Sequence, residues 1–440
     1  MAEGHLVNKE SKVRYLFDKA EELGKYGCDY SSLRTIEEEL KETMPSIPVY
    51  FLRPDSVKKS GEFFLKNFVV EGLVSRVLYS VKSNPCEDVL KCLFSSGIRN
   101  FDVASTDEVR LVDGLFGNAV KMYYMHPVKS RESIKEAYFD FGVRDFSLDS
   151  FEELDKILET TKDAKDLNLH IRLSIPNAYA AIDLTGKFGI LPIESIELLK
   201  ATKKVVKKLG ICFHVGSQCM EASQYRSSLD IVKDVLEQSG IEIDVLDIGG
   251  GFPSCYPGMM PAKLSTYFDE ILDAISSLEL PGNCEIWCEP GRALVAESAS
   301  LAVRVEGRKQ NMLYINDGTY GGLFDAGSLN FIYPAKALRF GGVELDSQME
   351  PFGFYGPTCD SVDVMKGPFY LPKDIKEGDY IEIGQLGAYS RALRTNFNGF
   401  GLSEQKMVSD KPLLSNYDLE GISDNLDKND NIRTLKKGTI

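Results

Sequence analysis

Eight short β-rich runs alternate with helical stretches between about residue 70 and residue 292, and a polar residue stands at or just after the end of nearly every run. This alternation predicts parallel strands connected by helices. We expect the strands at residues 77–81, 100–103, 121–125, 145–148, 169–173, 210–213, 245–248 and 285–288. The helices that we expect between them include residues 130–138, 150–160, 192–209 and 260–278.

Eight β/α units over roughly 220 residues have the size of a TIM (β/α)8 barrel. A doubly wound sheet also alternates strands and helices, so the alternation alone does not separate the two folds. The ends of the strands favour the barrel, because TIM barrels assemble their sites from residues at the C-terminal strand ends. We therefore predict an α/β chain built around such a barrel.

The chain changes character on both sides of the predicted barrel. Short strand patterns at residues 301–305, 312–315 and 380–383 alternate with Gly/Pro turns and indicate a C-terminal all-β domain. Residues 47–52 also resemble a strand and are expected to pair with that domain. The predicted division is residues 1–55 as an N-terminal segment contributing to the β domain, 56–297 as the barrel, 298–410 as the β domain, and 411–440 as a polar, partly disordered tail.

Composition excludes several classes of protein. The 66 acidic residues outnumber the 51 basic ones, and the net charge of −15 argues against a nucleic-acid partner. No run approaches the ~18 apolar residues of a membrane span, and the first residues lack the apolar core of a signal peptide. The nine cysteines and four histidines show no zinc-ligand spacing. We expect a cytoplasmic protein without a membrane segment or a metal.

Lys82 follows the first predicted barrel strand in the segment Tyr-Ser-Val-Lys-Ser-Asn-Pro. In a barrel mouth, burial or cationic neighbours would lower the pKa of this lysine and make it a candidate for Schiff-base chemistry. A surface lysine just past the strand is the alternative. His214, after the sixth strand, could stack on a planar ligand or act as an acid or base, and Ser217 could donate to a phosphate; a hydrogen-bonded structural histidine is the alternative there.

The loops after the seventh and eighth strands have the chemistry of a phosphate site. Three consecutive glycines, including Gly250 and Gly251, expose backbone N–H groups that can cradle a phosphate. The segment Glu289-Pro-Gly291-Arg292 follows the eighth strand, and TIM-barrel phosphate sites usually form from these two loops. A lysine, a phosphate cradle, a stacking histidine and a carboxylate together describe a site for pyridoxal phosphate.

These segments, with Gly-Pro-Thr-Cys-Asp-Ser-Val-Asp at residues 356–363, Gly-Ala-Tyr at 387–389 and Asn-Phe-Asn-Gly-Phe at 396–400, closely resemble the ornithine/diaminopimelate/arginine decarboxylase family of fold-type III pyridoxal-phosphate enzymes. The resemblance runs from about residue 47 to residue 400, and the Thr-Cys-Asp-x-x-Asp segment is similar to the ornithine branch. It implies an alanine-racemase-like barrel, an all-β domain, and a head-to-tail homodimer with shared active sites.

The resemblance also implies roles for individual residues. Lys82 matches the Schiff-base lysine, His214 the histidine that stacks on the ring, and Glu289 the partner of the pyridinium nitrogen. Cys359 matches the residue that helps to protonate the carbanion and Asp360 a substrate contact; in the family both come from the other subunit. The further cofactor positions that it implies are Asp102, Arg172, Ser217, Gly250, Gly251, Gly291, Arg292 and Tyr389.

Two segments bear on substrate choice. Ornithine enzymes of the family carry a Tyr-Asp pair for the distal ammonium after Asn-Asp-Gly-x-Tyr; here that segment is longer, Pro334 follows Tyr333, and Asp325 is a possible substitute. Arg391 and Arg394 stand just after Tyr389, where ornithine enzymes tend to have small neutral residues. Both arginines could form surface or dimer-interface ion pairs, or one could face the distal end of the substrate and favour a carboxylate there.

The sequence thus predicts a PLP-dependent α-decarboxylase. Its substrate would be an L-diamino acid or a distally acylated acidic derivative such as N-citrylornithine, a siderophore precursor. The alternatives are an ornithine or lysine decarboxylase that makes polyamines, a racemase on the same fold, and a non-catalytic regulatory homologue. Loss of catalysis should erase cofactor residues, and the complete set is present.

Overall fold

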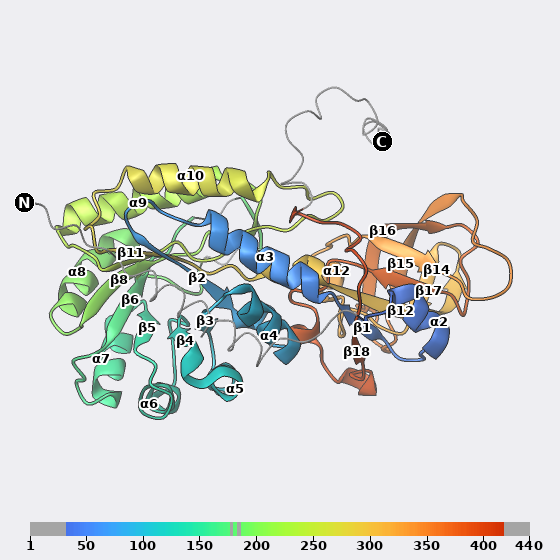
Figure 1. The fold of residues 1–440 in the computed structure, drawn as a ribbon, viewed down its shortest axis with the longest axis horizontal. Helices are drawn as coiled ribbons and strands as arrows, with labels where there is room; N and C mark the ends of the chain where they lie inside the picture. The colour runs from blue at the N-terminus through green and yellow to red at the C-terminus, as the bar shows by residue number, and fades with distance from the viewer. Residues whose placement is uncertain (1–31, 177–178, 183–185, 418–440) are drawn as a thin grey trace, which may run out of the picture.

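The computed structural model describes residues 32–176, 179–182 and 186–417. A barrel surrounded by helices lies beside a domain built mainly of β-strands, and α3 (Pro54–Asn67) leads from one to the other (Figure 1). No helix in the described part of the chain is both long and apolar enough to span a bilayer.

The barrel is closed by parallel strands in the order β10-β11-β2-β3-β4-β5-β6-β8, which confirms the predicted fold class. Each predicted run corresponds to one of its strands. These are β2 (Val74–Ser80), β3 (Asn100–Val103), β4 (Lys121–Tyr124), β5 (Asp145–Leu148), β6 (Asn168–Arg172), β8 (Lys208–Cys212), β10 (Val245–Asp247) and β11 (Glu285–Cys288).

Helices cover the outside of the barrel, and polar caps fix where several of them begin. Ser130 and Ser150 each accept a backbone N–H three residues later, so that two helices begin where the sequence predicts them. The helices after successive strands are α4 (Glu87–Ser96), α5 (Thr106–Phe116), α6 (Arg131–Phe139), α7 (Phe151–Thr160), α8 (Pro192–Lys203), α9 (Ser223–Ser239) and α10 (Leu264–Ser276).

The predicted helix at residues 192–209 is too long. It ends at Lys203, and residues from Lys208 onward form β8. A Cβ on Gly210 would lie 2.2 Å from Nδ1 of His170, so the strand passes this buried ring only with glycine at that position. Tertiary packing against β6 therefore overrides the local helical pattern.

The second domain is a mixed sheet in the order β14-β17-β12-β13-β15-β16. β1 (Val49–Leu52) pairs antiparallel with β12 (Ala299–Lys309) and parallel with β18 (Glu404–Met407), so a strand before the barrel and one near the end of the described chain join the same sheet. The other strands are β13 (Met312–Ile315), β14 (Ala335–Leu338), β15 (Met349–Tyr355), β16 (Val364–Pro372) and β17 (Tyr380–Ile383). Two short helices, α2 (Ile36–Thr43) and α12 (Phe324–Ser328), accompany them.

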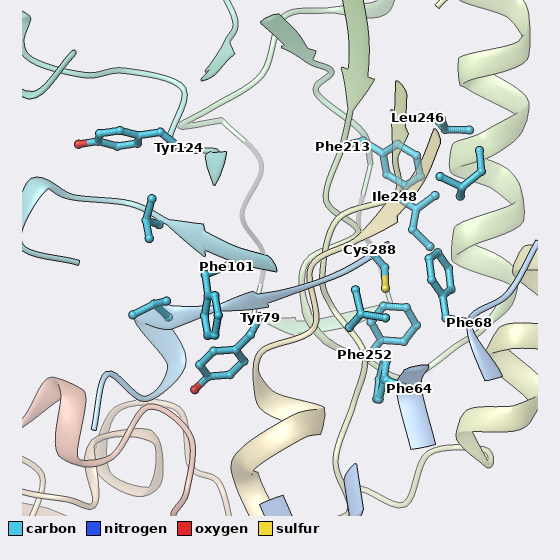
Figure 2. Packing of buried hydrophobic residues seen from close by; sticks show 14 of the residues in the cluster. Phe64, Phe68, Tyr79, Phe101, Tyr124, Phe213, Leu246, Ile248, Phe252 and Cys288 are labelled. Carbon is cyan, nitrogen blue, oxygen red and sulfur yellow. The ribbon is translucent and has the colours of Figure 1, made fainter. Parts of the chain in front are cut away.

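A continuous hydrophobic core lies between the barrel strands and their helices (Figure 2). Phe64 on α3 meets the rings of Phe252 and Phe268 edge-on, with both centroids at 5.2 Å. Such aromatic pairs add about 0.5–1.5 kcal/mol each beyond the area that they bury. This packing fixes the strand ends on which the site depends.

The start of the predicted polar tail packs on the barrel. The hydroxyl of Tyr417 donates to the carbonyl of Ala293 at 2.5 Å, and the side-chain amide of Asn416 donates to the carbonyl of Pro253 at 3.0 Å. Residues 411–417 are therefore part of the folded chain, and the rest of that predicted tail lies outside the described residues.

Candidate active site

A cavity of about 550 Å³ opens at the C-terminal ends of the barrel strands and extends to the β domain. It brings together side chains that the sequence predicts as site residues, namely Lys82, Asp102, Arg172, His214, Ser217, Arg292, Asp325 and Tyr389. The rest of the lining is Ala104, Met125, His126, Pro127, Ile182, Lys187, Phe188, Phe324, Leu329 and Leu393. Among the described residues, no cluster of His, Cys, Asp and Glu is arranged to hold a metal ion.

Lys82 lies in a short 3₁₀ turn directly after β2 and forms an ion pair. Its Nζ is 2.6 Å from Oδ2 of Asp102, an oxygen that also accepts the hydroxyl of Ser80 at 2.9 Å. Burial alone would lower the pKa of Lys82, but the carboxylates of Asp102 and Glu289 outweigh it and raise this pKa. The expectation of a lowered lysine pKa is therefore wrong for the protein without a ligand, and the amine is protonated at neutral pH.

His214 is held as a neutral ring. Its Nδ1 accepts the backbone N–H of Gly216 at 3.0 Å, which leaves the proton on Nε2. Burial lowers the pKa of His214 well below its ordinary value, and the charges of Arg172 and Lys82 lower it further. A neutral imidazole can stack on a planar ring that carries a positive charge without repelling it.

Glycines let the backbone approach this histidine closely. A Cβ on Gly250 would lie 2.6 Å from the carbonyl oxygen of Glu289 and 3.0 Å from Nε2 of His214. Gly251 has φ +103°, and a Cβ there would lie 2.6 Å from the carbonyl oxygen of Gly216. The loop after β10 therefore requires glycine at both positions, and its backbone remains open to an anion.

Glu289, just after β11, is a buried carboxylate that lacks a donor. Glu289 is 5% exposed, and no described group donates to its Oε1. Burial raises the pKa of Glu289 well above its ordinary value, and the nearby carboxylates Asp247 and Asp102 raise it further. A cationic N–H from a ligand would pair with this carboxylate and offset the cost of burying its charge.

Arg292 begins a short helix, α11 (Arg292–Val295), and is 3% exposed. Nη1 and Nη2 each lie 3.2 Å from Oδ2 of Asp325, and Nη1 also donates to the hydroxyl of Tyr256 at 2.9 Å. The ring of Tyr389 lies 4.9 Å from the guanidinium carbon. Asp325 therefore fixes the orientation of this cation in the cavity wall.

Three other residues predicted to contact substrate lie outside the cavity lining. Tyr333 is buried against Tyr256, with 5.5 Å between the ring centroids, and does not line the cavity. Arg394 pairs with Asp317 at 2.7 Å, and exposed Arg391 donates to the side chain of Gln405.

The two residues predicted to act across subunits lie outside the cavity lining, Cys359 exposed and Asp360 half-buried. The backbone N–H of Cys359 donates to the side chain of Asn398 at 3.1 Å, and Asp360 accepts the hydroxyl of Tyr320 at 2.6 Å. Most of the predicted cofactor side chains thus line one cavity, whereas Asp325 is the one predicted substrate residue that does so.

Sequence reasoning missed several lining residues. His126 lies two residues after the end of β4, so the strand-end rule that selected Lys82 could also have selected it. Its ring lies 5.0 Å from that of Phe188, and burial together with Lys129 lowers the pKa of His126. Lys187 and Phe188 come from the long connection between β6 and α8, where no strand end marks them.

The sequence pattern of the family described as pyridoxal-dependent decarboxylase, pyridoxal binding domain, matches residues 56–296. The chain belongs to this family of fold-type III enzymes and is a PLP-dependent amino-acid decarboxylase. The residues present fit the cofactor, because they supply a lysine amine, an open glycine loop and a buried carboxylate oxygen without a donor.

Individual relatives extend this likeness over most of the chain. A lysine/ornithine decarboxylase of Selenomonas ruminantium is 32% identical over 391 residues, which are 87% of this chain and 95% of that protein. An ornithine decarboxylase of Caenorhabditis elegans is 34% identical over 347 residues, covering 73% of this chain and 79% of that one. The crystal structure of a mutant of SrLDC in complex with PLP superposes with a TM-score of 0.74 at 29% identity, covering 86% of this chain and 97% of that one.

Proposed function

We propose that this decarboxylase acts on an L-amino acid with a distal amine, with lysine and ornithine as the first substrates to test. Asp325 is the observation that carries the proposal. It lines the cavity on the β-domain side, and only its Oδ2 is bonded to Arg292 within the described chain. Its other oxygen is available to accept a distal ammonium. The names of the relatives, lysine/ornithine decarboxylase and ornithine decarboxylase, support the same class of substrate.

In this proposal the cofactor residues have separate tasks. Lys82 binds the aldehyde carbon, His214 covers one face of the ring, and Glu289 holds the proton at the ring nitrogen. Asp102 and Arg172 flank the cofactor. The phosphate is bound by Ser217, Gly250, Gly251, Gly291, Arg292 and Tyr389. When bound, pyridoxal phosphate accepts the electron pair that remains at Cα after carbon dioxide leaves.

The proton that returns to Cα requires a donor, and we propose Cys359 of a second copy of the chain. In its own chain the Cys359 side chain is exposed and outside the cavity lining, next to Asp360. A head-to-tail homodimer would place this pair at the partner's cavity, and Asp360 would then contact the substrate. The proposed enzyme therefore has two shared sites, each with residues from both subunits.

Subunit mixing tests the shared site. Lys82→Ala and Cys359→Ala proteins, each inactive or nearly so, should regain activity when mixed, because one of the two hybrid sites has both residues intact. Mass spectrometry of isotope-labelled subunits would confirm the exchange. An exchanged mixture without activity would show that Cys359 does not act across the dimer.

A second substrate class, an acylated acidic derivative such as N-citrylornithine from siderophore synthesis, has its own supporting observation. Lys187 and Arg172 also line the cavity, whereas its carboxylates Asp102 and Asp325 are both ion-paired. These cations could bind a distal carboxylate. Arg391 and Arg394 do not line the cavity of their own chain, so this candidate no longer depends on them.

Rates of carbon dioxide release decide between the two classes. We would measure kcat/KM for lysine, ornithine and N-citrylornithine at saturating PLP in the parent, Asp325→Asn and Lys187→Met. For a diamino-acid enzyme, Asp325→Asn should raise KM for the free amine by roughly tenfold or more. A parent that prefers N-citrylornithine and loses that preference in Lys187→Met would establish the second class.

A further inference from the structure

Asp247 stands directly beside Glu289 but has no role in the site as described so far. It is the last residue of β10, which pairs with β11, and Glu289 follows β11. Its exposure is 0%, and its Oδ1 accepts the backbone N–H of Gly249 at 2.9 Å. In the parallel pairing Asp247 lies opposite Trp287, two residues before Glu289, and the charge of Asp247 raises the pKa of Glu289. Two like charges in contact at this depth would be strongly unfavourable.

One oxygen of each carboxyl group lacks a hydrogen-bond donor. Oδ2 of Asp247 and Oε1 of Glu289 are both buried, and neither accepts a hydrogen bond from a described donor. Buried carboxylate oxygens without donors are costly. A single proton between the two groups would give each of them a hydrogen-bond partner and would leave one negative charge on the pair.

We propose that Asp247 and Glu289 share one proton, and that Asp247 is a positioning residue that keeps Glu289 ready to accept the N–H of the cofactor ring. With the proton on Asp247, Glu289 retains its charge and receives a hydrogen bond on one oxygen. Its other oxygen is then left for the ring nitrogen. The buried pair would therefore stabilise the cofactor with a protonated ring nitrogen, which is its electron-accepting form.

The groups around the pair agree with this reading. Burial raises the pKa of both carboxyl groups. The charges that act on the pair come from several strands and do not supply a direct donor: Asp102 opposes ionisation, whereas His170, Lys82 and Arg172 favour it. The neighbouring thiols Cys212 and Cys288 are themselves kept protonated by burial, which raises the pKa of each.

Asparagine at position 247 is the matched probe. Asp247→Asn keeps the shape and supplies a permanent N–H donor to Glu289, so the variant carries the same single charge as the protonated pair. Asp247→Ala removes the donor. Asp145→Asn is the control, because Asp145 is equally buried but paired with Lys121 at 2.9 Å and His170 at 3.2 Å, and hydrogen bonding to His170 helps to hold its pKa below the ordinary value despite burial.

The first readout uses the protein without cofactor. Infrared difference spectra of the parent against Asp247→Asn should show the loss of one carbonyl stretch from a protonated carboxylic acid at neutral pH. The parent against Asp145→Asn should show no such loss. An Asp247→Asn protein that keeps the full acid band of the parent would overturn the proposal, whatever the substrate of the enzyme proves to be.

The second readout is cofactor binding followed by absorbance across pH. Asp247→Asn should bind PLP within about threefold of the parent, and its absorbance should resist alkaline change by at least about one pH unit more, because it has no shared proton to lose. Asp247→Ala should weaken PLP binding at least about tenfold. Equal loss of binding in the Asn and Ala variants would show that Asp247 acts as a charge rather than as a donor.

Discussion

The two walls of the cavity are built in different ways. On the barrel side, Lys82, His214 and Glu289 each follow a strand, and neighbouring groups such as the Gly216 N–H orient them toward one space. On the β-domain side, Asp325 and Tyr389 lie on long connections, and other polar groups of this domain, such as Arg394 and Asp317, pair with each other outside the cavity lining. Rigid strand ends thus preorganise the cofactor chemistry, whereas the connections that face the substrate are free to differ in length and partners.

Removal of Lys82 should give the largest effect, because it abolishes the chemistry that we assign to the barrel side of the cavity. Lys82→Ala should reduce carbon dioxide release by at least about a thousandfold, because it removes the amine that Asp102 holds at the end of β2. Borohydride treatment followed by peptide mapping should locate the cofactor on Lys82 in the parent. Near-parental turnover in Lys82→Ala would refute the assignment of this lysine.

Removal of Arg394 should have the next largest effect, on folding rather than on catalysis. Asp317 is fully buried, and its Oδ1 also accepts the backbone N–H groups of Gly318 and Gly322 at 2.7 Å each. Arg394→Met would leave that carboxylate without its cation and should lower the free energy of unfolding by about 3–5 kcal/mol.

Urea unfolding measures this loss. Arg394→Met combined with Asp317→Asn should recover part of the stability, since the double variant has no unpaired buried charge. A change in substrate preference without loss of stability would contradict the structural role of this ion pair.

Separate replacement of Glu289 and Arg292 should have different effects, one on kcat and the other on PLP affinity. Glu289→Gln should still bind PLP but lose roughly 10- to 100-fold in kcat, since a neutral pyridine ring accepts electrons poorly. Arg292→Ala should mainly weaken PLP affinity through the lost charge-assisted contact. Titration with PLP and steady-state rates at saturating PLP separate the two effects. Parental kcat in Glu289→Gln would refute the ring-nitrogen role.

The sequence predicted the barrel side well because a strand end is a local feature with a fixed direction. Lys82, His214 and Glu289 were each found from a β-rich run followed by a polar residue; Lys82 and His214 line the cavity, and the charge of Glu289 raises the pKa of Lys82. Arg391 and Arg394 were a different case, because their position after Tyr389 does not specify where long side chains reach. Asp247 was not predicted as a site residue, because the strand pattern does not distinguish a structural acid from one that positions a neighbouring site carboxylate.

Asp325 shows the remaining difficulty. Asp325 on α12 is 33 residues from Arg292 at the start of α11, and only the folded chain reveals the contact between them. The raised pKa of Lys82 was missed for the same reason, because its cause is Asp102 on the neighbouring strand β3. Charge pairing between elements depends on packing geometry that local patterns do not contain.

Removal of Arg391 should have the smallest effect and gives the sharpest contrast with Arg394. The two arginines are three residues apart, but Arg391 is exposed and donates to the side chain of Gln405, which itself donates to Asp88 at 2.8 Å. Exposed polar contacts of this kind contribute about 0–1 kcal/mol. Arg391→Ala should therefore change the urea midpoint slightly and alter kcat/KM for lysine, ornithine and N-citrylornithine by less than about twofold.

Gln405→Ala is the matched control, because it removes the same contact from the other side. A selective loss of N-citrylornithine turnover in Arg391→Ala, with Gln405→Ala unaffected, would mean that this guanidinium reaches a substrate in the assembled enzyme and that the β-domain wall is completed by a second chain.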